Sequence, residues 1–319
     1  MDERRSAQAE MLLRRIQKRW RHRSRAARAE QSECFRVYDR DIPELPLAID
    51  WYEGRLHLSL FEHPSIREEE EEALLSSWGH YLAEALNAEG VYTKVRRRMR
   101  GARQYTASSR RGRPFAVKEG GYRFLVDLES YLDTGLFLDH RRTRRMAAAE
   151  AEGRRALNLF AYTGSFTVHL AGGGARSVDT VDSSQRYLAW AEENLKLNQL
   201  DGPRCRFWRS DVRDFLSDAA SAGRRYELII LDPPTFSNRK GGVEFSVLRD
   251  HGQLIRTLEA VTAPGAILYF STNAKRFKLE DALMTRWEGR EITRETIPRD
   301  FDQRDPHRCW RLVRRSAQA

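Results

Sequence analysis

The sequence predicts an α/β fold in which a parallel, doubly wound sheet forms the larger part and a smaller mixed α/β module precedes it. Residues 155–182 have the pattern of a strand, a turn, a helix and a second strand. The alternation of strands and helices continues to residue 231, as in sheets built from right-handed crossovers. Asp182, Asp211 and Asp232 each follow a predicted strand, at the sheet edge where such folds bind ligands.

The unit at residues 155–182 indicates a nucleoside cofactor. An apolar run at Ala156–Phe160 breaks at Tyr162–Gly164, a helix is expected over Ser165–Ala171, and the next strand ends at Asp182, 18 residues after Gly164. An acid about 20 residues after such a turn holds a ribose in doubly wound folds. A pyrophosphate needs several glycines in the turn, and only one is present. S-adenosylmethionine, which carries a ribose and an adenine but no phosphate, fits this turn; a βαβ unit without a ligand remains the alternative.

The composition limits the class of protein. A chain of 319 residues can bury a full α/β core and a second small domain. Cys34, Cys205 and Cys309 are far apart, so we predict neither a disulfide scaffold nor a metal site, and we expect a reducing compartment. No apolar run approaches the roughly 20 residues that span a bilayer, and no apolar segment follows the basic N-terminus. We therefore expect a cytoplasmic protein outside the membrane.

Positive charge is concentrated in two segments. Of the net charge of +10, residues 1–30 supply ten Lys/Arg against four Asp/Glu, and residues 94–113 supply nine against none. Clustered arginine is typical of proteins that neutralise nucleic-acid phosphates. For residues 1–30 a solvated helix face is an equally good interpretation, and a clamp on nucleic acid is the other. In the second segment we predict contacts with RNA from Arg96, Arg97, Arg98, Arg100, Arg103, Arg110 and Arg111.

The N-terminal residues predict a basic helix and then a small α/β module. Apolar residues four apart give residues 7–29 a single narrow apolar face. Alternating residues predict strands at 35–39, 47–52 and 55–61, with Glu53-Gly54 as a hairpin turn. A helix is expected after Ser65 as far as residue 87, with Glu68–Glu72 at the positive end of its dipole. Strands at 91–95 and 122–128 flank the basic loop. We place the domains at residues 1–34, 35–145 and 146–319.

The most specific chemical signal follows the fourth predicted strand of the larger sheet. After Asp182 we expect a helix at 185–197, a strand at 204–208, a helix ending at about 220 and a strand at 226–231. This last strand leads into Asp232-Pro233-Pro234. Two prolines lack N–H donors and fix φ, so they form a rigid turn with carbonyls that only accept. Such a ledge suits a flat heterocycle with N–H groups, on which Phe236 could stack. A turn that merely ends the strand is the alternative.

Several motifs in combination resemble one family. The segments YLDTGLFLDHR, LNLFAYTGSFTVH, TVDSSQRYLAWAEENLKLN, LDPPTFSNRK and DFDQRDPHRCW are similar to the guanine-N7 methyltransferase half of the bacterial bifunctional 23S ribosomal RNA guanine-N2/N7 methyltransferase. The resemblance implies a class I, Rossmann-like S-adenosylmethionine fold. It also implies methylation of one guanine in 23S ribosomal RNA or in a large-subunit assembly intermediate. The other half has no counterpart in this chain, which is either a stand-alone version or a fragment, and a separate guanine-N2 methyltransferase is a candidate partner.

The resemblance also implies roles for individual residues. Asp182 is expected to bind the ribose, Asp211 to face the adenine, and Asp232 with its two prolines to line the methyl-transfer position. Arg249, Asp250 and His251 match the family pattern without an assignable role. The cofactor-binding residues implied in this way are Phe137, Asp139, Arg141, Phe160, Tyr162, Thr163, Gly164, Ser165, Phe166, Asp182, Ser183, Asp211 and Val212. The catalytic candidates are Asp232, Pro233, Pro234 and Phe236.

The residues favour nitrogen over carbon as the acceptor of the methyl group. Methylation of pyrimidine C5 needs a cysteine nucleophile, and neither the segment after Asp232 nor Phe270–Asn273 contains one. Guanine N7 has an exposed lone pair and loses no proton, whereas the exocyclic N2 loses a proton that Asp232 could accept. The choice of N7 over N2 rests on the resemblance. A nicotinamide oxidoreductase, disfavoured by the single glycine, and a non-catalytic RNA-binding protein on the same fold remain open.

Overall fold

The computed structural model describes residues 3–64, 66–96, 112–131, 133–237, 244–301 and 305–316. Contacts divide the chain into two compact units, Met1–Leu138 with Pro298–Arg304, and Asp139–Ile297 with Asp305–Ala319. The sequence analysis placed the boundary near residue 145 and did not foresee that a late segment joins the first unit. None of the helices in the described ranges combines the length and the apolar character that a membrane span requires.

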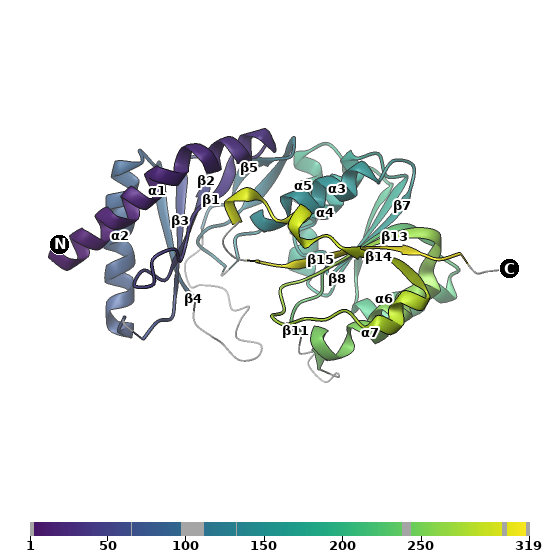
Figure 1. Cartoon of the computed structure of the whole chain (residues 1–319). Helices are drawn as coiled ribbons and strands as arrows, with labels where there is room; N and C mark the ends of the chain where they lie inside the picture. The colour runs from purple at the N-terminus through teal and green to yellow at the C-terminus, as the bar shows by residue number, and fades with distance from the viewer. Residues whose placement is uncertain are drawn as a thin grey trace. The chain divides into compact units, whose positions relative to one another are not determined.

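The first unit is built on a four-stranded mixed sheet with the order β1-β2-β3-β4 (Figure 1). Strands β1, β2 and β3 are antiparallel, and β3 and β4 are parallel because α2 crosses over between them. Glu53 and Gly54, both with positive φ, form the predicted hairpin turn. The elements are α1 Glu3–Ala29, β1 Cys34–Asp39, β2 Leu47–Tyr52, β3 Arg55–Phe61, η1 Glu68–Glu70, α2 Glu71–Ala85, β4 Gly90–Arg96, β5 Phe115–Glu119, β6 Tyr122–Val126 and η6 Arg299–Phe301.

Most predicted elements of this unit are confirmed, and one was missed. Strand β5 pairs with β6 in a separate hairpin, although the sequence analysis gave the whole segment before Tyr122 to the basic loop. The late segment is tied in by Asp300, whose Oδ2 accepts a 2.9 Å hydrogen bond from the backbone N–H of Arg36. The guanidinium of Arg36 also lies 4.5 Å from the ring centroid of Phe301. These contacts explain why residues 298–304 belong to the first unit.

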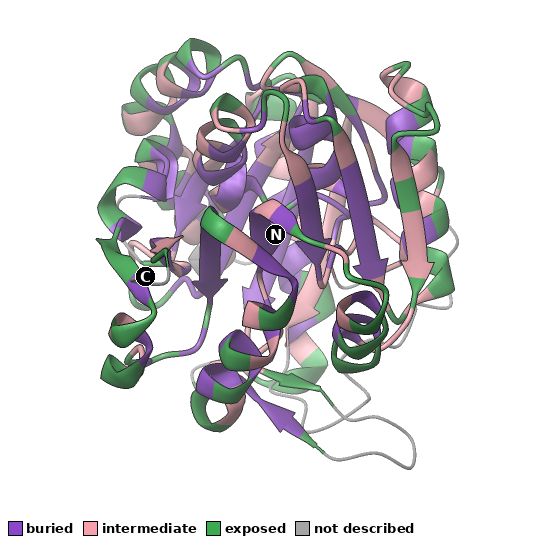
Figure 2. Cartoon of the chain, turned by 90° about the vertical axis from the view of Figure 1, so that its right-hand side faces the viewer, coloured by how far each residue is buried: buried purple, intermediate pink, exposed green. Residues whose placement is uncertain are grey.

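The second unit is a seven-stranded sheet in the order β14-β15-β13-β10-β7-β8-β9. The five strands from β13 to β9 are parallel, as predicted, whereas β15 is antiparallel to both of its neighbours. Figure 2 shows the central strands buried among the helices. The elements are η3 Leu138–His140, α3 Arg141–Ala149, β7 Arg155–Leu159, α4 Ser165–Gly172, β8 Ser177–Asp182, α5 Gln185–Leu197, β9 Cys205–Arg209, α6 Val212–Ser221, β10 Tyr226–Leu231, β11 Phe236–Ser237, β12 Phe245–Ser246, α7 Val247–Leu258, η4 Glu259–Val261, β13 Thr262–Thr272, η5 Asp281–Thr285, β14 Trp287–Glu291, α8 Thr293–Thr296 and β15 Arg308–Arg314.

The order of the parallel strands fixes where a ligand can bind. From β7 the chain builds outward through β8 to β9 and then returns to the other side of β7 with β10 and β13. This reversal between β7 and β10 is a topological switch point, and doubly wound sheets bind ligands outside the carboxyl ends of the strands at such a point. A depression lined by Glu152–Arg154, Glu227 and Pro264–Ala266 lies instead near the amino ends of β7, β10 and β13, so we do not assign it to the site.

Candidate functional site

The turn between β7 and α4 has an unusual backbone. Phe160, Tyr162 and Gly164 have φ angles of 56°, 51° and 73°, all in the left-handed region. Each non-glycine residue in that region stores about 1–3 kcal/mol of strain, which is typical of functional sites. Gly164 caps α4, and a Cβ added there would lie 2.5 Å from Cβ of Ala191 in α5. The single predicted glycine is therefore required by both conformation and space.

Polar contacts with buried side chains hold this turn in place. Asn194 of α5 donates from Nδ2 to the backbone oxygen of Thr163 at 2.9 Å. Asn158 of β7 donates to Thr167 Oγ1 at 3.0 Å, and Thr167 is itself 2.9 Å from Thr180 Oγ1. These groups are buried, so their mutual satisfaction fixes the geometry of the turn. This supporting network was not predicted from the sequence because its side chains come from four different elements.

Asp182, at the end of β8, is the anchor of the site. Its Oδ2 accepts from the backbone N–H of Tyr162 and its Oδ1 from that of Ser184, both at 2.9 Å. Burial raises the pKa of Asp182, and the backbone hydrogen bonds from Ser184, Tyr162 and Ser183 oppose that rise. These three backbone N–H groups leave one of the roughly four acceptor positions of the carboxylate, so the side chain can still accept from a neighbouring hydroxyl. A ribose supplies such a hydroxyl, and the residues present therefore fit the predicted nucleoside.

Asp211 and Val212 lie beside Phe160 in a small pocket. Asp211 caps α6 by accepting from the backbone N–H of Arg213 at 2.8 Å. The ring of Phe160 stacks on that of Phe245, with centroids 6.1 Å apart and planes at 27°. The sequence analysis did not single out Phe245. The pocket is lined by Phe160, Asp211, Val212, Arg213, Ser237, Phe245 and Leu254.

The Asp-Pro-Pro turn after β10 is coupled to the end of β13. Asp232 Oδ1 accepts from the hydroxyl of Ser271 at 2.6 Å. Thr235 donates from its hydroxyl to Asn273 Oδ1, also at 2.6 Å. Pro233 is buried, whereas Phe236 is 55% exposed. The turn is therefore held rigid from the neighbouring strand while its outer side chain stays accessible.

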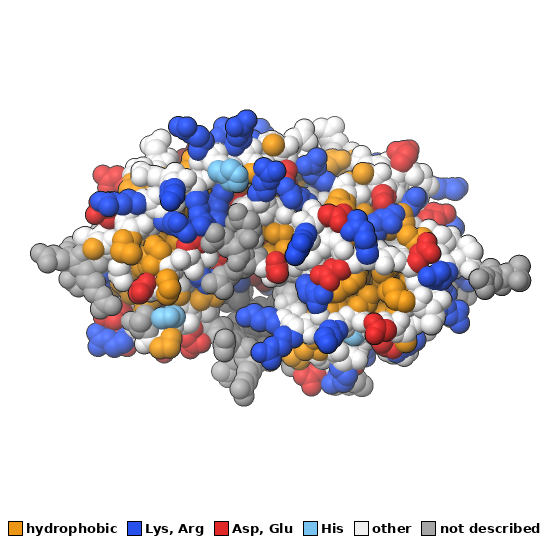
Figure 3. Space-filling model, viewed as in Figure 1, with side chains coloured by type: hydrophobic (Ala, Val, Ile, Leu, Met, Phe, Trp, Pro, Cys, Tyr) orange, Lys and Arg blue, Asp and Glu red, His pale blue; other side chains and the backbone are white. Residues whose placement is uncertain are grey.

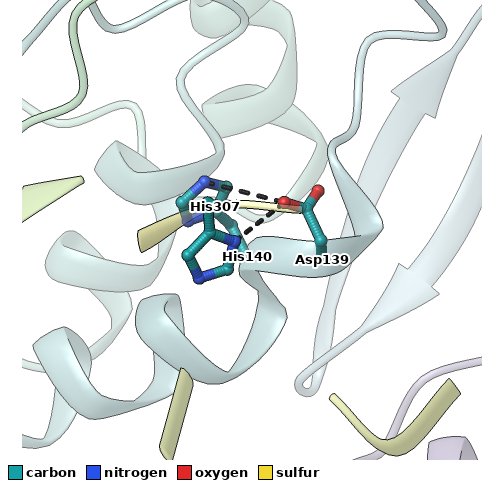
Figure 4. A group of neighbouring side chains, drawn as sticks. All are labelled: Asp139, His140 and His307. Atoms are coloured by element: carbon teal, nitrogen blue, oxygen red, sulfur yellow. Dashed lines mark hydrogen bonds and ion pairs between the residues drawn. The ribbon is translucent and has the colours of Figure 1, made fainter. Parts of the chain in front are cut away.

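Two histidines that were not predicted from the sequence, His140 and His307, lie beside Asp139 (Figure 4). His307 Nδ1 is 2.9 Å from Asp139 Oδ2, and its Nε2 is 3.0 Å from Thr296 Oγ1. His140 Nε2 lies 3.8 Å from both Asp139 Oδ2 and Asp232 Oδ2. Burial, and secondarily the charge of His307, lower the pKa of His140 to about 4.

The ligand-type atoms of Asp139, His140 and His307 lie within 4.8 Å of one another, as in a metal site. The two imidazole rings, however, are stacked, with centroids 4.0 Å apart and planes at 16°. Lone pairs of ring nitrogens lie in the ring planes, so two nearly parallel rings do not direct them at one ion. The arrangement therefore suits a hydrogen-bonded chain of side chains better than a bound metal ion.

The remaining predicted residues have varied surroundings. Phe137 is 44% exposed and belongs to the first unit, whereas Arg141 is fully buried at the start of α3. Arg96, at the end of β4, lies 3.3 Å from Asp133. The other predicted RNA contacts lie outside the described residues; these are Arg97, Arg98, Arg100, Arg103, Arg110 and Arg111.

The Arg249-Asp250-His251 motif has structural contacts. Arg249 pairs with its neighbour Asp250 at 2.8 Å, and Asp250 accepts from the backbone N–H of Ser246 at the start of α7. His251 is buried, which lowers its pKa, and its Nε2 accepts from the backbone N–H of Glu280 at 3.1 Å. These contacts stabilise the start of α7 and the chain that follows β13.

Residues 33–308 match a family of S-adenosylmethionine-dependent methyltransferases. The chain is 41% identical over 313 residues to ribosomal RNA large subunit methyltransferase K of Neisseria meningitidis, covering 95% of this chain and 86% of that protein. It is 44% identical over 310 residues to the K/L protein of Pseudomonas putida strain GB-1, covering 95% of this chain and 42% of that protein. The chain thus spans less than half of the K/L relatives that it matches.

Solved structures share the fold. A Streptococcus mutans protein described as an S-adenosylmethionine-dependent methyltransferase superimposes with a TM-score of 0.76 at 23% identity, covering 96% of this chain and 81% of that one. A methyltransferase complexed with S-adenosylhomocysteine gives a TM-score of 0.75 at 22% identity, with the same coverage. At these identities the likeness extends to the fold.

Proposed function

The chain belongs to the S-adenosylmethionine-dependent methyltransferase family, and from that premise we propose that it methylates N7 of a guanine in 23S ribosomal RNA. The cofactor is S-adenosylmethionine, which supplies an electrophilic methyl group. The observation that carries the proposal is the single edge of the sheet at which Asp182, Asp211 and Asp232 each follow a parallel strand.

Different residues at this edge of the sheet bind different parts of the cofactor. Asp182 accepts the ribose hydroxyls, and the pocket of Phe160, Asp211 and Val212 takes the adenine. The turn from Phe160 to Phe166, in which Phe160 and Tyr162 have positive φ angles, holds the methionine part. Asp139 and Arg141 contribute from the segment before β7. Ser183 adds its backbone N–H to the Asp182 carboxylate.

The Asp-Pro-Pro turn receives the base. The ring of Phe236 stacks on one face of the guanine, and the carbonyls of the proline turn accept its N–H groups. N7 attacks through its own lone pair and loses no proton, so the chain only has to align and desolvate it. Alignment of this kind can lower a barrier by up to ~7–11 kcal/mol. The guanine gains a positive charge, which the Asp232 carboxylate offsets.

Carbon methylation is disfavoured by the state of the nearest cysteine. Cys309 of β15 pairs in register with Ser271, the residue that donates to Asp232. Its side chain is fully buried, and this burial, together with the Asp232 charge, raises the pKa of the thiol well above its usual value. A neutral, enclosed thiol is a poor nucleophile. Transfer to the exocyclic N2, with Asp232 taking the proton, remains the second candidate function.

The RNA substrate is supported by the names of relatives at 41–44% identity, which are ribosomal RNA large subunit methyltransferases. We propose that the arginines of residues 96–111 contact the RNA backbone and that the protein acts in the cytoplasm. A separate guanine-N2 methyltransferase is a proposed partner.

The test is methylation of unmodified 23S ribosomal RNA, transcribed in vitro, with S-adenosylmethionine as the donor. A guanine methylated at N7 is cleaved after borohydride reduction and aniline treatment, whereas one methylated at N2 is resistant. Cleavage at one guanine, absent with the Asp232→Ala variant, is the expected result. A methylated but cleavage-resistant guanine would favour N2, and RNA without added methyl groups would contradict the proposal.

A further inference from the structure

We propose that the exposed face of α1 is a second contact surface for the RNA backbone, formed by Lys18, Arg21, Arg25 and Arg28. The inference rests on the proposed function, because it takes RNA as the substrate. It assigns a role to helix α1. From the sequence alone, a solvated helix face and a clamp on nucleic acid were equally good interpretations of this helix.

The four cations share one side of the helix. Their spacing of three, four and three residues places them on neighbouring turns of the same face, and all four are exposed. Leu12, Ile16 and Ala27, on the opposite face, are fully buried in the core of the first unit. Figure 3 shows Lys and Arg side chains gathered along α1, whose course is labelled in Figure 1. The folding of α1 therefore turns its cationic side outward.

These cations differ from several exposed arginines of the chain in having no carboxylate partner among the described residues. In the described ranges Lys18, Arg21 and Arg25 have no carboxylate within ion-pair distance, and Arg28 donates to Ser24. Arg15 and Arg19 on the flank of the same helix both reach Asp41, at 2.9 and 2.7 Å. Several exposed arginines elsewhere are ion-paired; examples are Arg67 with Glu70, Arg256 with Glu280 and Arg290 with Glu295.

The unpaired charges weaken the isolated protein. Like charges three or four residues apart on a helix destabilise it by about 0.2–0.5 kcal/mol per pair. Lys18 with Arg21, Arg21 with Arg25, and Arg25 with Arg28 are three such pairs. A polyanion placed along this face removes the repulsion and releases its own counterions. The charge pattern is thus unfavourable alone and favourable in a complex.

The length and surroundings of the cationic face indicate which kind of polyanion it binds. The stripe from residue 18 to 28 is about 15 Å long at 1.5 Å per residue, which matches a chain of phosphates better than a single small anion. A membrane-surface helix needs a free apolar face, and here that face is buried in the core. Trp20 packs edge-on against Phe35 and Trp51 and is only partly exposed, so it is not a platform for bases. We therefore expect contact with phosphates and little dependence on sequence.

The test is the salt dependence of RNA binding by a variant carrying Lys18→Gln, Arg21→Gln and Arg25→Gln. Each phosphate contact contributes about 0.7–0.9 to the slope of log K against log salt, so this slope should become shallower by about 2. A matched variant carrying Arg67→Gln, Arg256→Gln and Arg290→Gln removes the same charge from ion-paired sites and should change the slope far less. Calorimetry should give wild-type affinity for S-adenosylmethionine in both variants.

The outcomes separate this surface from the proposed function. If the wild-type protein binds and methylates the RNA but the α1 variant keeps its affinity and slope, the surface is wrong and the function stands. The surface is also wrong if both variants lose the same slope, because net charge alone then explains binding. If the wild-type protein binds no ribosomal RNA, both the proposed function and the proposed contact surface are wrong. Loss of binding to an acidic ribosomal protein, with RNA binding intact, would reassign the surface to a protein partner.

Discussion

His140 Nε2 lies 3.8 Å from Oδ2 of Asp232, while the hydroxyl of Ser271 donates to Oδ1 of the same carboxylate at 2.6 Å. The neutral imidazole faces carboxylate oxygens with Nε2, so we assign its proton to that nitrogen. Its Nδ1 is buried without a hydrogen-bond partner in the described part of the chain. One oxygen of Asp232 therefore accepts from a hydroxyl, and the other faces an N–H group of His140. We infer that His140 positions the Asp232 carboxylate, which lines the site of the guanine.

Replacing His140 should affect turnover and leave cofactor binding intact. The His140→Phe variant keeps the ring shape but loses the N–H that faces Asp232. We expect kcat for RNA methylation to fall by up to about 10-fold, because an N–H group 3.8 Å from a carboxylate interacts more weakly than a hydrogen bond to a charged group. The His140→Gln variant restores a donor and should recover most of this loss. Equal losses in both variants, or a parallel loss of affinity for S-adenosylmethionine, would indicate a merely structural role.

The pKa of His140 also predicts a pH dependence of stability. Its folded-state pKa of about 4 lies below the ordinary value of 6.5, because burial and the charges of His307 and Arg144 outweigh the opposing effect of Asp232 and Asp139. The unfolded chain therefore binds the extra proton first, and the stability from the neutral ring, full above about pH 6.5, is lost as the pH falls toward 4. Between pH 7 and pH 5 this group costs about 2 kcal/mol of the free energy of unfolding.

Denaturant titrations at pH 7 and pH 5 measure this effect. The wild-type protein should lose more stability over this interval than His140→Gln, by about 2 kcal/mol. His57 is a second fully buried histidine, in the first unit, and burial lowers its pKa to about 3, so the variant should retain part of the acid sensitivity. The same loss in wild type and variant would show that His140 does not titrate as described.

Gly164→Ala should damage the cofactor site. The added Cβ meets Cβ of Ala191 at 2.5 Å, and the φ of 73° is strained for alanine. We expect a loss of about 2–4 kcal/mol in the free energy of unfolding, together with weaker binding of S-adenosylmethionine. Gly223 has a similar φ of 67° with open space around it, so Gly223→Ala should cost only about 1 kcal/mol and leave binding unchanged. Equal effects at the two sites would remove the argument from close packing.

Asp182→Asn should weaken cofactor binding. The amide can accept from only one of the two backbone N–H groups of Tyr162 and Ser184, and its NH₂ then opposes the other. We expect the Kd for S-adenosylmethionine to rise by about 10-fold or more. Asp218→Asn makes the same chemical change at an exposed position of α6 and should leave the Kd unchanged. Calorimetry measures the Kd of both variants. If the Kd is the same in both, the assignment of Asp182 to the ribose is wrong.

The strands, the helices and the residues at the sheet edge could be predicted from the sequence because they depend on local sequence patterns. Hydrophobic periodicity predicted β7, β8, β10 and most helices within a few residues, and the aspartate after each strand followed from chain order alone. The β7 prediction extended to Phe160, whose positive φ instead starts the turn. Strand β5 was missed because it follows the basic segment without a break in composition.

The rest of the site depends on contacts between distant residues. His307 comes 168 residues after Asp139 and Ser271 comes 39 after Asp232, and no spacing rule connects either pair. Phe245 joins Phe160 across 85 residues of sequence. The antiparallel insertion of β15 between β13 and β14 likewise follows from the sheet and not from a local pattern. Such groups become visible only when the sheet brings their strands together.

A crystal structure with S-adenosylhomocysteine tests the central claim most directly. The account predicts that the ribose hydroxyls contact Asp182, that the adenine lies in the pocket of Phe160, Asp211 and Val212, and that the sulfur points toward Asp232. If the nucleoside binds elsewhere, or the edge of the sheet stays closed by side chains at saturating ligand, the account is contradicted.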